Sequence, residues 1–411
     1  MADHARSDDA AVQAQLDRFA QLSPGRDILG LERITELLRH LGSPHERLPP
    51  VFHVAGTNGK GSTCAFLRAC IEAAGLTAHV YTSPHLVRFN ERIRVAGRLI
   101  DDADLALLLA EVLDVAEAHA IGPSFFEATT AAAFLAFSRT SADACIVEVG
   151  LGGRLDATNI IANPLICGIA QLGVDHQAFL GETLADMATE KAGIAKHGVP
   201  MVVLAQAHEA LARITAATSK TGAPLLVEGR DWEVDTSLHT GLQGSHQLRN
   251  ASLAATMLRI TEFVSEDAIH KGIAQTRWPA RLQSLNAGPL TALLPSGSAI
   301  TIDGAHNPAA AKALAVELSA NPRHLIVGIL ANKDADNILT ELAPHALSLT
   351  FIDVPHHASA DRNALTRQWG GTAADGLEAA LSQFKTPSDI LIVGSLYLAG
   401  EALRLNLQFP D

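Results

Sequence analysis

Residues 51–64 read VFHVAGTNGKGSTC, and this stretch decides the fold. Five mostly apolar residues predict a buried strand, three glycines surround Lys60, and the apolar residues that follow open a helix. A polyphosphate must be met at close range by backbone N–H groups, which glycine permits, so the stretch is interpreted as strand, phosphate loop and helix. It departs from the pattern G-x-x-x-x-G-K-[ST], because Val54 replaces the first glycine and Gly61 separates Lys60 from Ser62. A glycine-rich turn without a ligand is the alternative for so short a match.

Two other predicted strands end in polar side chains. Residues 78–81 lead to Ser83, and residues 144–150 carry Glu148 at the end of an apolar run. In an open parallel sheet, ligands gather at the carboxyl ends of the strands. A carboxylate is costly there unless it is exposed or holds a metal, so Glu148 is a magnesium candidate. Ser83 taken alone reads as a strand-ending serine before a proline.

Length and composition indicate a two-domain globular protein. The chain has 411 residues, which is more than a single hydrophobic core usually organises. Of these residues 48% are hydrophobic and 18% are charged, as in ordinary globular proteins. A net charge of -13 argues against nucleic acid as the main partner, because phosphate backbones are bound by basic surfaces. The four cysteines lack C-x-x-C spacing, the start lacks the apolar core of a signal peptide, and no apolar run approaches the ~20 residues that span a bilayer. We therefore expect a cytoplasmic protein without a membrane segment.

The rest of the chain predicts helices alternating with short strands. Helical spacing is found at residues 11–41, 102–119, 124–137, 209–220, 246–263 and 266–275, and Thr183 is a suitable N-cap for one more helix. Strands are expected at 165–170, 201–204 and 224–227, followed by a β-rich excursion at 232–247. A second set of strands is expected at 299–302, 325–329, 348–352 and 390–393. The pattern predicts an α/β fold with a P-loop parallel-sheet ATPase domain at 1–281 and a smaller Rossmann-like domain at 282–411.

Taken together, several short motifs resemble the folylpolyglutamate synthase and dihydrofolate synthase family of Mur-type ATP-dependent amide ligases. The matching stretches follow the family's order along nearly the whole chain: 56–62, 83–86, 126–127, 148–159, 175–176, 190–194, 246–250, 303–308 and 394–397. The irregular phosphate loop is itself the form this family uses, whereas Ala280 stands where the family commonly has glycine. The resemblance implies a Mur-ligase fold, ATP, two Mg²⁺ ions and a monomer that joins L-glutamate to dihydropteroate and to folate polyglutamates in folate biosynthesis.

The resemblance also implies roles for residues to which the local sequence pattern assigns no function. Taken singly, His176 after a strand reads as a polar loop residue and Lys191 on a helix as a solvated side chain. By resemblance, the catalytic set is Lys60, Glu148, His176 and a carbamylated Lys191, and the metal ligands are Ser83, Glu148 and His176. Nucleotide contacts are implied at Gly59, Lys60, Gly61, Ser62, Asn250, Arg281 and Asp303. Acceptor and glutamate contacts are implied at Gly30, Leu31, Ser124, Phe125, Phe126, Glu127, Leu155, Asp156, Ala157, His306 and Ser395.

The implied reaction phosphorylates a carboxylate and captures it with the amine of glutamate, a task of positioning and charge neutralisation. Folylpolyglutamate synthase activity alone is one alternative. A cell-wall amide ligase is another, although only about 50 residues precede the loop and that class usually carries an additional N-terminal domain. Two alternatives outside the ligases are a P-loop switch that hydrolyses ATP without ligation and a nucleotide-binding module without turnover.

Overall fold

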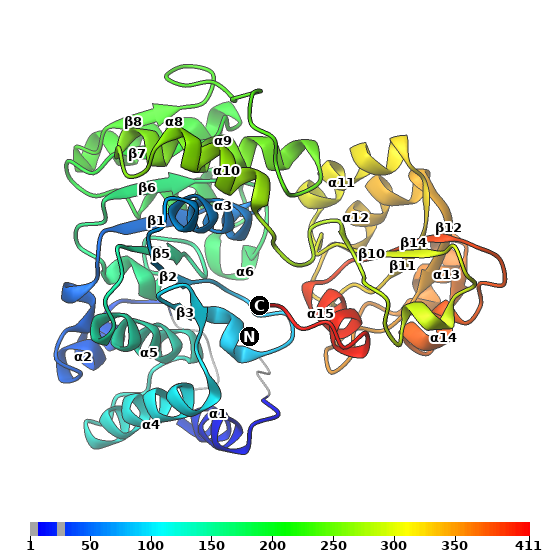
Figure 1. The fold of residues 1–411 in the computed structure, drawn as a ribbon, viewed down its shortest axis with the longest axis horizontal. Helices are drawn as coiled ribbons and strands as arrows, with labels where there is room; N and C mark the ends of the chain where they lie inside the picture. The colour runs from blue at the N-terminus through cyan, green and yellow to red at the C-terminus, as the bar shows by residue number, and fades with distance from the viewer. Residues whose placement is uncertain (1–6, 23–28) are drawn as a thin grey trace. The chain divides into compact units, whose positions relative to one another are not determined.

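The computed structural model describes residues 7–22 and 29–411, and this part of the chain forms two compact units (Figure 1). The first unit contains the residues up to Gly241 together with Gln247–Thr276. The second unit contains Leu242–His246 and Arg277–Asp411. The chain therefore crosses between the units near residues 241, 246 and 276, whereas the sequence analysis drew a single boundary after Arg281.

The first unit is built on an eight-stranded sheet in the order β4-β3-β2-β5-β1-β6-β7-β8. Its strands are β1 (Val51–Ala55), β2 (Ala78–Tyr81), β3 (Ile93–Val95), β4 (Arg98–Leu99), β5 (Ala144–Glu148), β6 (Ile166–Ile169), β7 (Met201–Val203) and β8 (Leu225–Val227). The six strands from β2 to β8 in this order pair in parallel, and β3 and β4 add an antiparallel edge. Strand β1 lies between β5 and β6, so the loop after β1 sits where the strand order reverses.

Helices cover both faces of this sheet (Figure 1). They are α1 (Ala10–Leu22), α2 (Glu32–His40), α3 (Lys60–Ala73), α4 (Asp102–Ala118), α5 (Phe125–Arg139), α6 (Gln177–Leu180), α7 (Leu184–Ala192), α8 (His208–Thr221), α9 (Ser245–Ile260) and α10 (Glu266–Gln275), with the 3₁₀ turns η1 (Pro44–Arg47), η2 (Phe89–Arg92) and η3 (Ala157–Ile160). Helices α3 and α10 pack together, and Cys70 Sγ of α3 donates a hydrogen bond of 3.4 Å to the Ile269 carbonyl of α10. On the sheet, Gly168 of β6 leaves room for the Met257 side chain of α9.

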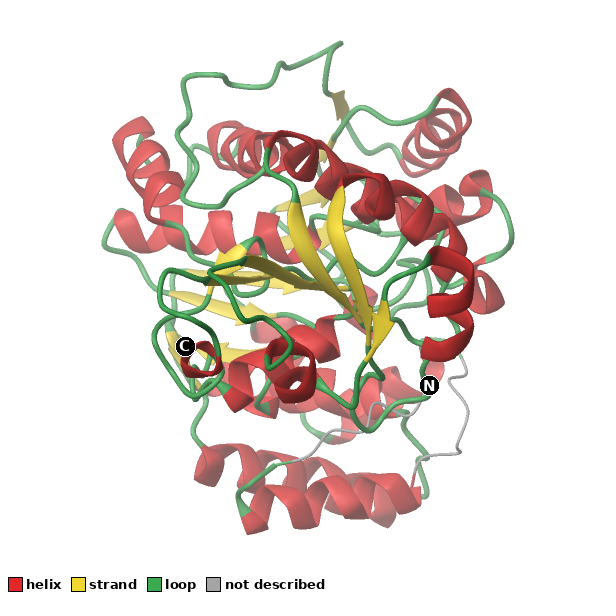
Figure 2. Cartoon of the chain, turned by 90° about the vertical axis from the view of Figure 1, so that its right-hand side faces the viewer, coloured by secondary structure: helices red, strands yellow, loops and turns green. Residues whose placement is uncertain are grey.

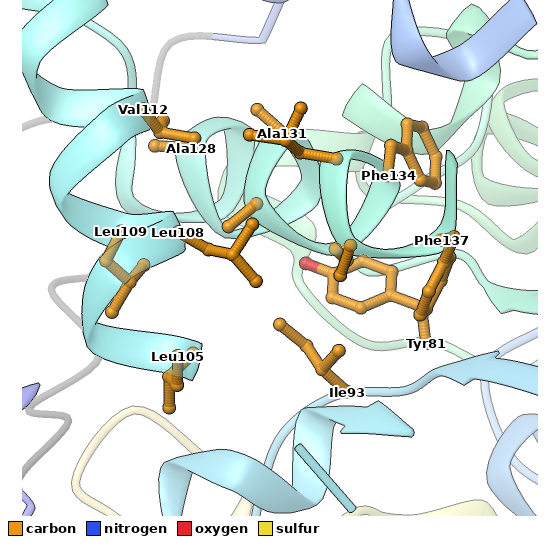
Figure 3. Packing of buried hydrophobic residues seen from close by; sticks show 14 of the residues in the cluster. Tyr81, Ile93, Leu105, Leu108, Leu109, Val112, Ala128, Ala131, Phe134 and Phe137 are labelled. Carbon is orange, nitrogen blue, oxygen red and sulfur yellow. The ribbon is translucent and has the colours of Figure 1, made fainter. Parts of the chain in front are cut away.

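The opposite face carries a large apolar core between α4, α5 and strands β2 and β3 (Figure 3). Leu105, Leu109 and Val112 of α4 are buried there against Ala128 and Ala131 of α5. The hydroxyl of Tyr81 is a polar group in this core, and it forms a 3.1 Å hydrogen bond with the Thr130 hydroxyl, as a buried polar group requires. This packing fixes the start of α5 beside the ends of the central strands.

The second unit has a six-stranded sheet in the order β13-β12-β11-β14-β10-β9. Its strands are β9 (Gln283–Ser284), β10 (Ala299–Ile302), β11 (Arg323–Val327), β12 (Ala346–Phe351), β13 (Thr372–Ala373) and β14 (Asp389–Val393), parallel except for β9. The helices are α11 (Pro308–Ala320), α12 (Ala335–Leu342), α13 (Arg362–Trp369), α14 (Leu377–Leu381) and α15 (Leu396–Leu405), with η4 (Thr291–Leu293) and η5 (Ala343–His345). The sheet twists and carries helices along its sides (Figure 2), as a Rossmann-like domain requires.

One predicted element is wrong. The segment 232–247, expected to be rich in β-structure, contains turns, one isolated bridge between Glu228 and Trp232, and the start of α9. Two aspartates explain the difference, because Asp231 accepts a hydrogen bond from the Val227 amide and Asp235 accepts one from the Ser237 amide. Such local side-chain bonds favour turns over ladders. Among the described residues, no helix is both long enough and apolar enough to cross a bilayer.

Candidate active site

The phosphate loop is held rigidly at the start of α3. Gly59 precedes the helix with a φ of 89°, and a side chain there would overlap the amide of Asn250 on α9. The amides of Thr57 and Asn58 both donate to the Gln171 carbonyl, at 3.0 and 3.1 Å. Asn250, which the resemblance implies as a nucleotide contact, therefore lies directly beside the loop.

Lys60 and Glu148 face each other across this loop. Lys60 Nζ lies 3.9 Å from Glu148 Oε1 and donates a 3.2 Å hydrogen bond to the Thr57 carbonyl. Glu148 ends β5 opposite Val54 of β1, and only 4% of it is exposed. Its Oε2 accepts a 3.3 Å hydrogen bond from the Ser83 amide, so three separate strand ends meet at one carboxylate. A buried carboxylate shared by a lysine and a backbone amide is suited to an ionic ligand.

Lys191 is buried on α7, with 6% of it exposed. Its helix begins at Thr183, whose hydroxyl accepts from the Asp186 amide and confirms the predicted N-cap. Burial, together with the positive charge of Lys60, lowers the pKa of Lys191 to about 7 against opposing contributions from Asp175 and Asp156. About half of the amine is therefore neutral at pH 7, whereas an ordinary solvated lysine is almost fully charged.

His176 is the most exposed of the four proposed catalytic residues. It adopts a left-handed backbone with a φ of 55° immediately before α6, and its amide donates to Asp175 Oδ1 at 2.8 Å. Asp175 interacts electrostatically with Lys191, and His176 is the next residue in the chain. Lys60, Ser83, Glu148 and Lys191 are thus linked by direct contacts or electrostatic interactions, with His176 following one residue after Asp175.

The residues around the loop fit a magnesium ion held by oxygen. The Ser62 hydroxyl is completely buried without a hydrogen-bond partner among the described residues, which is unusual for a buried polar group and fits a ligand-binding role. Hydroxyl and carboxylate oxygens are the ligands Mg²⁺ takes, with phosphate oxygens completing the shell. Within the described ranges, no three His, Cys, Asp or Glu side chains gather to hold a metal. A metal at this loop is therefore suited to Ser62, Glu148 and a bound polyphosphate rather than to an all-protein cage.

The residues proposed for the acceptor converge between α2, α5 and the turn before η3. Ser124 and Glu127 form a capping box at the start of α5, and Glu127 Oε2 also accepts from Arg33 Nε at 3.0 Å. The other oxygen of Glu127 is buried and unpaired. Phe125 and Phe126 are half-buried above the apolar core, with Phe126 filling the space next to Gly150. Leu31 packs against the same core, and Gly30 precedes it.

Asp156 differs from a free ligand-binding carboxylate. Its oxygens accept from the amides of Leu151 and Thr158, at 2.8 and 3.0 Å, so the side chain folds its own loop. Burial raises the pKa of Asp156 against these hydrogen bonds. The neighbours Leu155 and Ala157 are half-buried and buried, respectively. This loop packs closely against α7, because a Cβ on Gly153 would overlap the carbonyls of Glu190 and Lys191.

The other proposed residues lie in the second unit. Asp303 Oδ2 accepts from the Leu282 amide and Oδ1 from the Ala305 amide, both at 2.9 Å. The Ser395 hydroxyl caps α15 by accepting from the Tyr397 amide at 3.1 Å, and His306 Nδ1 donates to the Gly304 carbonyl at 2.8 Å. Ala280, which stands where the family commonly has glycine, has a φ of 55°, a left-handed conformation that favours glycine. Arg281 lies beside Gly304.

Two residues that stabilise this site, Arg154 and Glu190, were not singled out from the sequence. Arg154 Nη2 lies 2.8 Å from Glu190 Oε1 and its amide donates to the Glu190 carbonyl, which ties the acceptor loop to the helix of Lys191. The available signal was the position of Glu190 directly before that lysine. Their separation of 36 residues hides the pair from local patterns.

A phosphate loop at the switch point of a parallel sheet, beside a buried carboxylate and a buried lysine, defines a P-loop nucleotide-binding α/β protein. The chain matches no protein-family model. It is 34% identical over 90% of its length to the dihydrofolate synthase/folylpolyglutamate synthase of Bacillus subtilis, covering 94% of that protein, and 32% identical to the Escherichia coli protein of the same name, at 92% and 91% coverage. The chain thus belongs to the dihydrofolate synthase/folylpolyglutamate synthase family.

Solved structures agree with this assignment. Escherichia coli FolC in complex with DHPP and ADP superposes with a TM-score of 0.85 at 30% identity, covering 96% of this chain and 97% of that one. Folylpolyglutamate synthase of Mycobacterium tuberculosis complexed with ADP gives 0.86 at 28% identity, with 98% and 99% coverage. The Mur-ligase fold predicted from the sequence is confirmed. The chain spans about half the length of a third relative, the probable bifunctional folylpolyglutamate synthase/dihydropteroate synthase of Halobacterium salinarum, at 32% identity.

Proposed function

We propose that this protein is an ATP-dependent acid–amino-acid ligase that joins L-glutamate to dihydropteroate, giving dihydrofolate, and to folate polyglutamates. The observation that carries the proposal is the convergence of Lys60, Glu148 and a buried Lys191 of lowered pKa at the end of β1. The relatives named above, and a FolC structure containing DHPP and ADP, support the same substrates.

In the first half-reaction, a carboxylate oxygen of the acceptor attacks the γ-phosphorus of ATP and ADP leaves, so an acyl phosphate forms. The amides of the loop at Gly59, Gly61 and Ser62 bind the phosphates, and Lys60 offsets the charge that builds up during transfer. Two Mg²⁺ ions would neutralise phosphate charge when bound. Ser62, Ser83, Glu148 and His176 are the residues proposed to hold them, with Ser62 Oγ and Glu148 already buried at the loop.

Lys191 supplies a further anionic group in this proposal. The neutral amine that burial favours can attack carbon dioxide, forming an N–C bond and releasing a proton, and the product is a carbamate. A carbamate oxygen is a ligand that Mg²⁺ accepts, whereas an ammonium group would repel the ion. The low pKa thus supports carbamylation at physiological pH.

The acceptor is proposed to lie against α5 and the loop before η3. The rings of Phe125 and Phe126 offer an apolar surface for a flat heterocycle, and the unpaired oxygen of Glu127 can accept from a ring N–H or amino group. Gly30, Leu31, Leu155, Asp156 and Ala157 form the rest of the proposed set. The second half-reaction needs glutamate, whose amine attacks the acyl carbon as phosphate leaves.

Residues of the second unit are proposed to serve glutamate and the nucleotide. His306 and Ser395 follow strands β10 and β14, and Asp303 directly follows β10. Arg281 precedes β9, whose Gln283 pairs with Ile302 at the carboxyl end of β10. In a parallel sheet these are ends where ligands gather. The proposed domains are 1–281 and 282–411. We further propose a monomer in the cytoplasm, consistent with four buried free cysteines.

The test is product mass. Pure protein is incubated with ATP, Mg²⁺, glutamate and either dihydropteroate or a reduced folate. We expect each product to gain one or more glutamyl residues, with one ADP released per residue added. Phosphate release without acceptor and glutamate would instead indicate a P-loop switch. Ligation to reduced folate alone would restrict the activity to folylpolyglutamate synthase, and ligation to a nucleotide-linked muramoyl acceptor would indicate a cell-wall ligase.

A further inference from the structure

The turn η2 has no role in the mechanism above, yet it holds two charged side chains, the half-buried Glu91 and the buried Arg92. Glu91 lies at the end of this turn, and its carboxylate accepts three successive backbone N–H groups. Oε2 accepts from Leu86 at 2.8 Å, and Oε1 accepts from Val87 at 2.9 Å and from Arg88 at 2.6 Å. Burial raises the pKa of Glu91, and these hydrogen bonds oppose the rise. A carboxylate used in this way fixes the loop that precedes the turn.

Arg92 is the second charged residue of η2, and only 2% of it is exposed. Its Nε donates a 2.9 Å hydrogen bond to His85 Nδ1, in the same loop that Glu91 holds. Its guanidinium carbon lies 5.4 Å from the centre of the Phe89 ring and 5.5 Å from that of Phe125. Those distances fit cation–π contacts, which gain strength when water is excluded.

The two side chains therefore join the two sides of the proposed site. The loop they hold contains Ser83, whose amide contacts Glu148. On the other side, Phe125 is one of the aromatic residues proposed for the acceptor, and it packs edge-on against Phe89 at 5.8 Å. Buried charges are costly unless their hydrogen-bonding capacity is used. The contacts that satisfy Glu91 and Arg92 are also the ones that join the Ser83 loop to Phe125.

We propose that Glu91 and Arg92 are positioning residues that hold the Ser83 loop and the Phe125 ring as one rigid group. In this arrangement, the position of the phosphate side of the site and the affinity for the acceptor depend on the same turn. The inference rests on the proposed function, because the roles of Ser83 and Phe125 come from it. The hydrogen bonds themselves do not depend on that function.

Two variants and a control test the inference. Glu91→Gln replaces one accepting carboxylate oxygen by an amide NH2 group, which cannot accept a hydrogen bond. Arg92→Lys keeps the charge but removes the planar guanidinium donor. Arg94→Lys is the matched control, since Arg94 Nη1 donates to the Gly97 carbonyl at the far end of the hairpin. His85→Leu is a second route that removes the partner of Arg92 from a half-exposed position.

Hydrogen exchange of the peptide covering residues 83–88 is measured without ligands, and KM is measured separately for ATP and for the acceptor. We expect exchange about tenfold faster in Glu91→Gln, because hydrogen bonds to a charged acceptor are stronger than those to a neutral one. In Arg92→Lys and His85→Leu, we expect the KM for the acceptor to rise about tenfold, with Arg94→Lys unchanged. Unchanged exchange, or a fall in kcat with both KM values preserved, would overturn the inference. Absence of ligation in the unmodified protein would instead refute the proposed function, and the exchange result would still report on the loop.

Discussion

The pKa of Lys191 leads to a prediction about stability that needs no substrate. Burial, with the positive charge of Lys60, lowers this pKa from 10.5 to about 7. The unfolded chain exposes the amine and restores its ordinary value. Between about pH 7 and 10.5 the unfolded chain therefore binds more protons than the folded one, and stability must rise with pH across that window.

The size of the effect follows from these two values. Each pH unit of difference is worth about 1.4 kcal/mol, so the buried amine costs the folded state about 4 kcal/mol at pH 7 and about 2 kcal/mol at pH 9. Below pH 7 both states are protonated and the cost stays constant. Lys191→Met removes the titrating group, and with it this pH dependence, whatever constant change in packing the methionine introduces.

Urea unfolding in buffers free of carbon dioxide measures the difference. We expect the stability of Lys191→Met relative to the unmodified protein to fall by about 2 kcal/mol from pH 7 to pH 9. Lys220→Met, on the exposed side of α8, is the matched control and should follow the unmodified protein. A stability difference between Lys191→Met and the unmodified protein that does not change with pH would refute the reasoning, since it would mean that Lys191 titrates as a solvated lysine.

Three further predictions concern neighbouring groups. Burial lowers the pKa of His53 to about 3, so between about pH 3 and 6.5 the unfolded chain binds more protons than the folded one, and stability decreases as the pH is lowered through this window. From pH 7.5 to 5, His53→Gln should therefore lose about 2 kcal/mol less stability than the unmodified protein in urea titrations, and equal losses would contradict this. Lys60→Ala should weaken ADP binding at least about tenfold by calorimetry, because a charge-assisted contact is lost, and unchanged affinity would refute the phosphate-loop assignment. Gly153→Ala would bring a Cβ to 2.7 Å from the Glu190 carbonyl oxygen and 3.0 Å from Lys191 Cα. We therefore expect about 1–3 kcal/mol of destabilisation and a lower kcat. Full activity would show that α7 can shift freely.

Much of the nucleotide side of the site could be predicted from local sequence. Strand, glycine loop and helix are contiguous between residues 51 and 73, and Glu148 ends an apolar run, so the parallel sheet brings them to one edge. Lys191 could not be predicted in this way. A lysine on a helix reads as solvated. The glycine-rich loop that packs against Lys191, and the Lys60 charge that helps to lower its pKa, are both distant in the sequence.

The acceptor side shows the same limit of local patterns. Glu127 is paired with Arg33 across 94 residues, so its role as a buried acceptor with one unpaired oxygen emerges only in the fold. Asp156 was grouped by resemblance with the substrate contacts, whereas its oxygens bind the amides of its own loop. The prediction at 232–247 was wrong because Asp231, just before the segment, and Asp235 within it accept hydrogen bonds from nearby amides, which favours turns over a ladder.

The central claim is that this site activates a carboxylate by phosphorylating it. Dihydropteroate labelled with ¹⁸O in its carboxyl group is ligated to glutamate, and the released phosphate is weighed by mass spectrometry. Transfer through an acyl phosphate predicts one ¹⁸O in each phosphate formed during ligation. Phosphate carrying only unlabelled oxygen, with ligation proceeding normally, would contradict the mechanism.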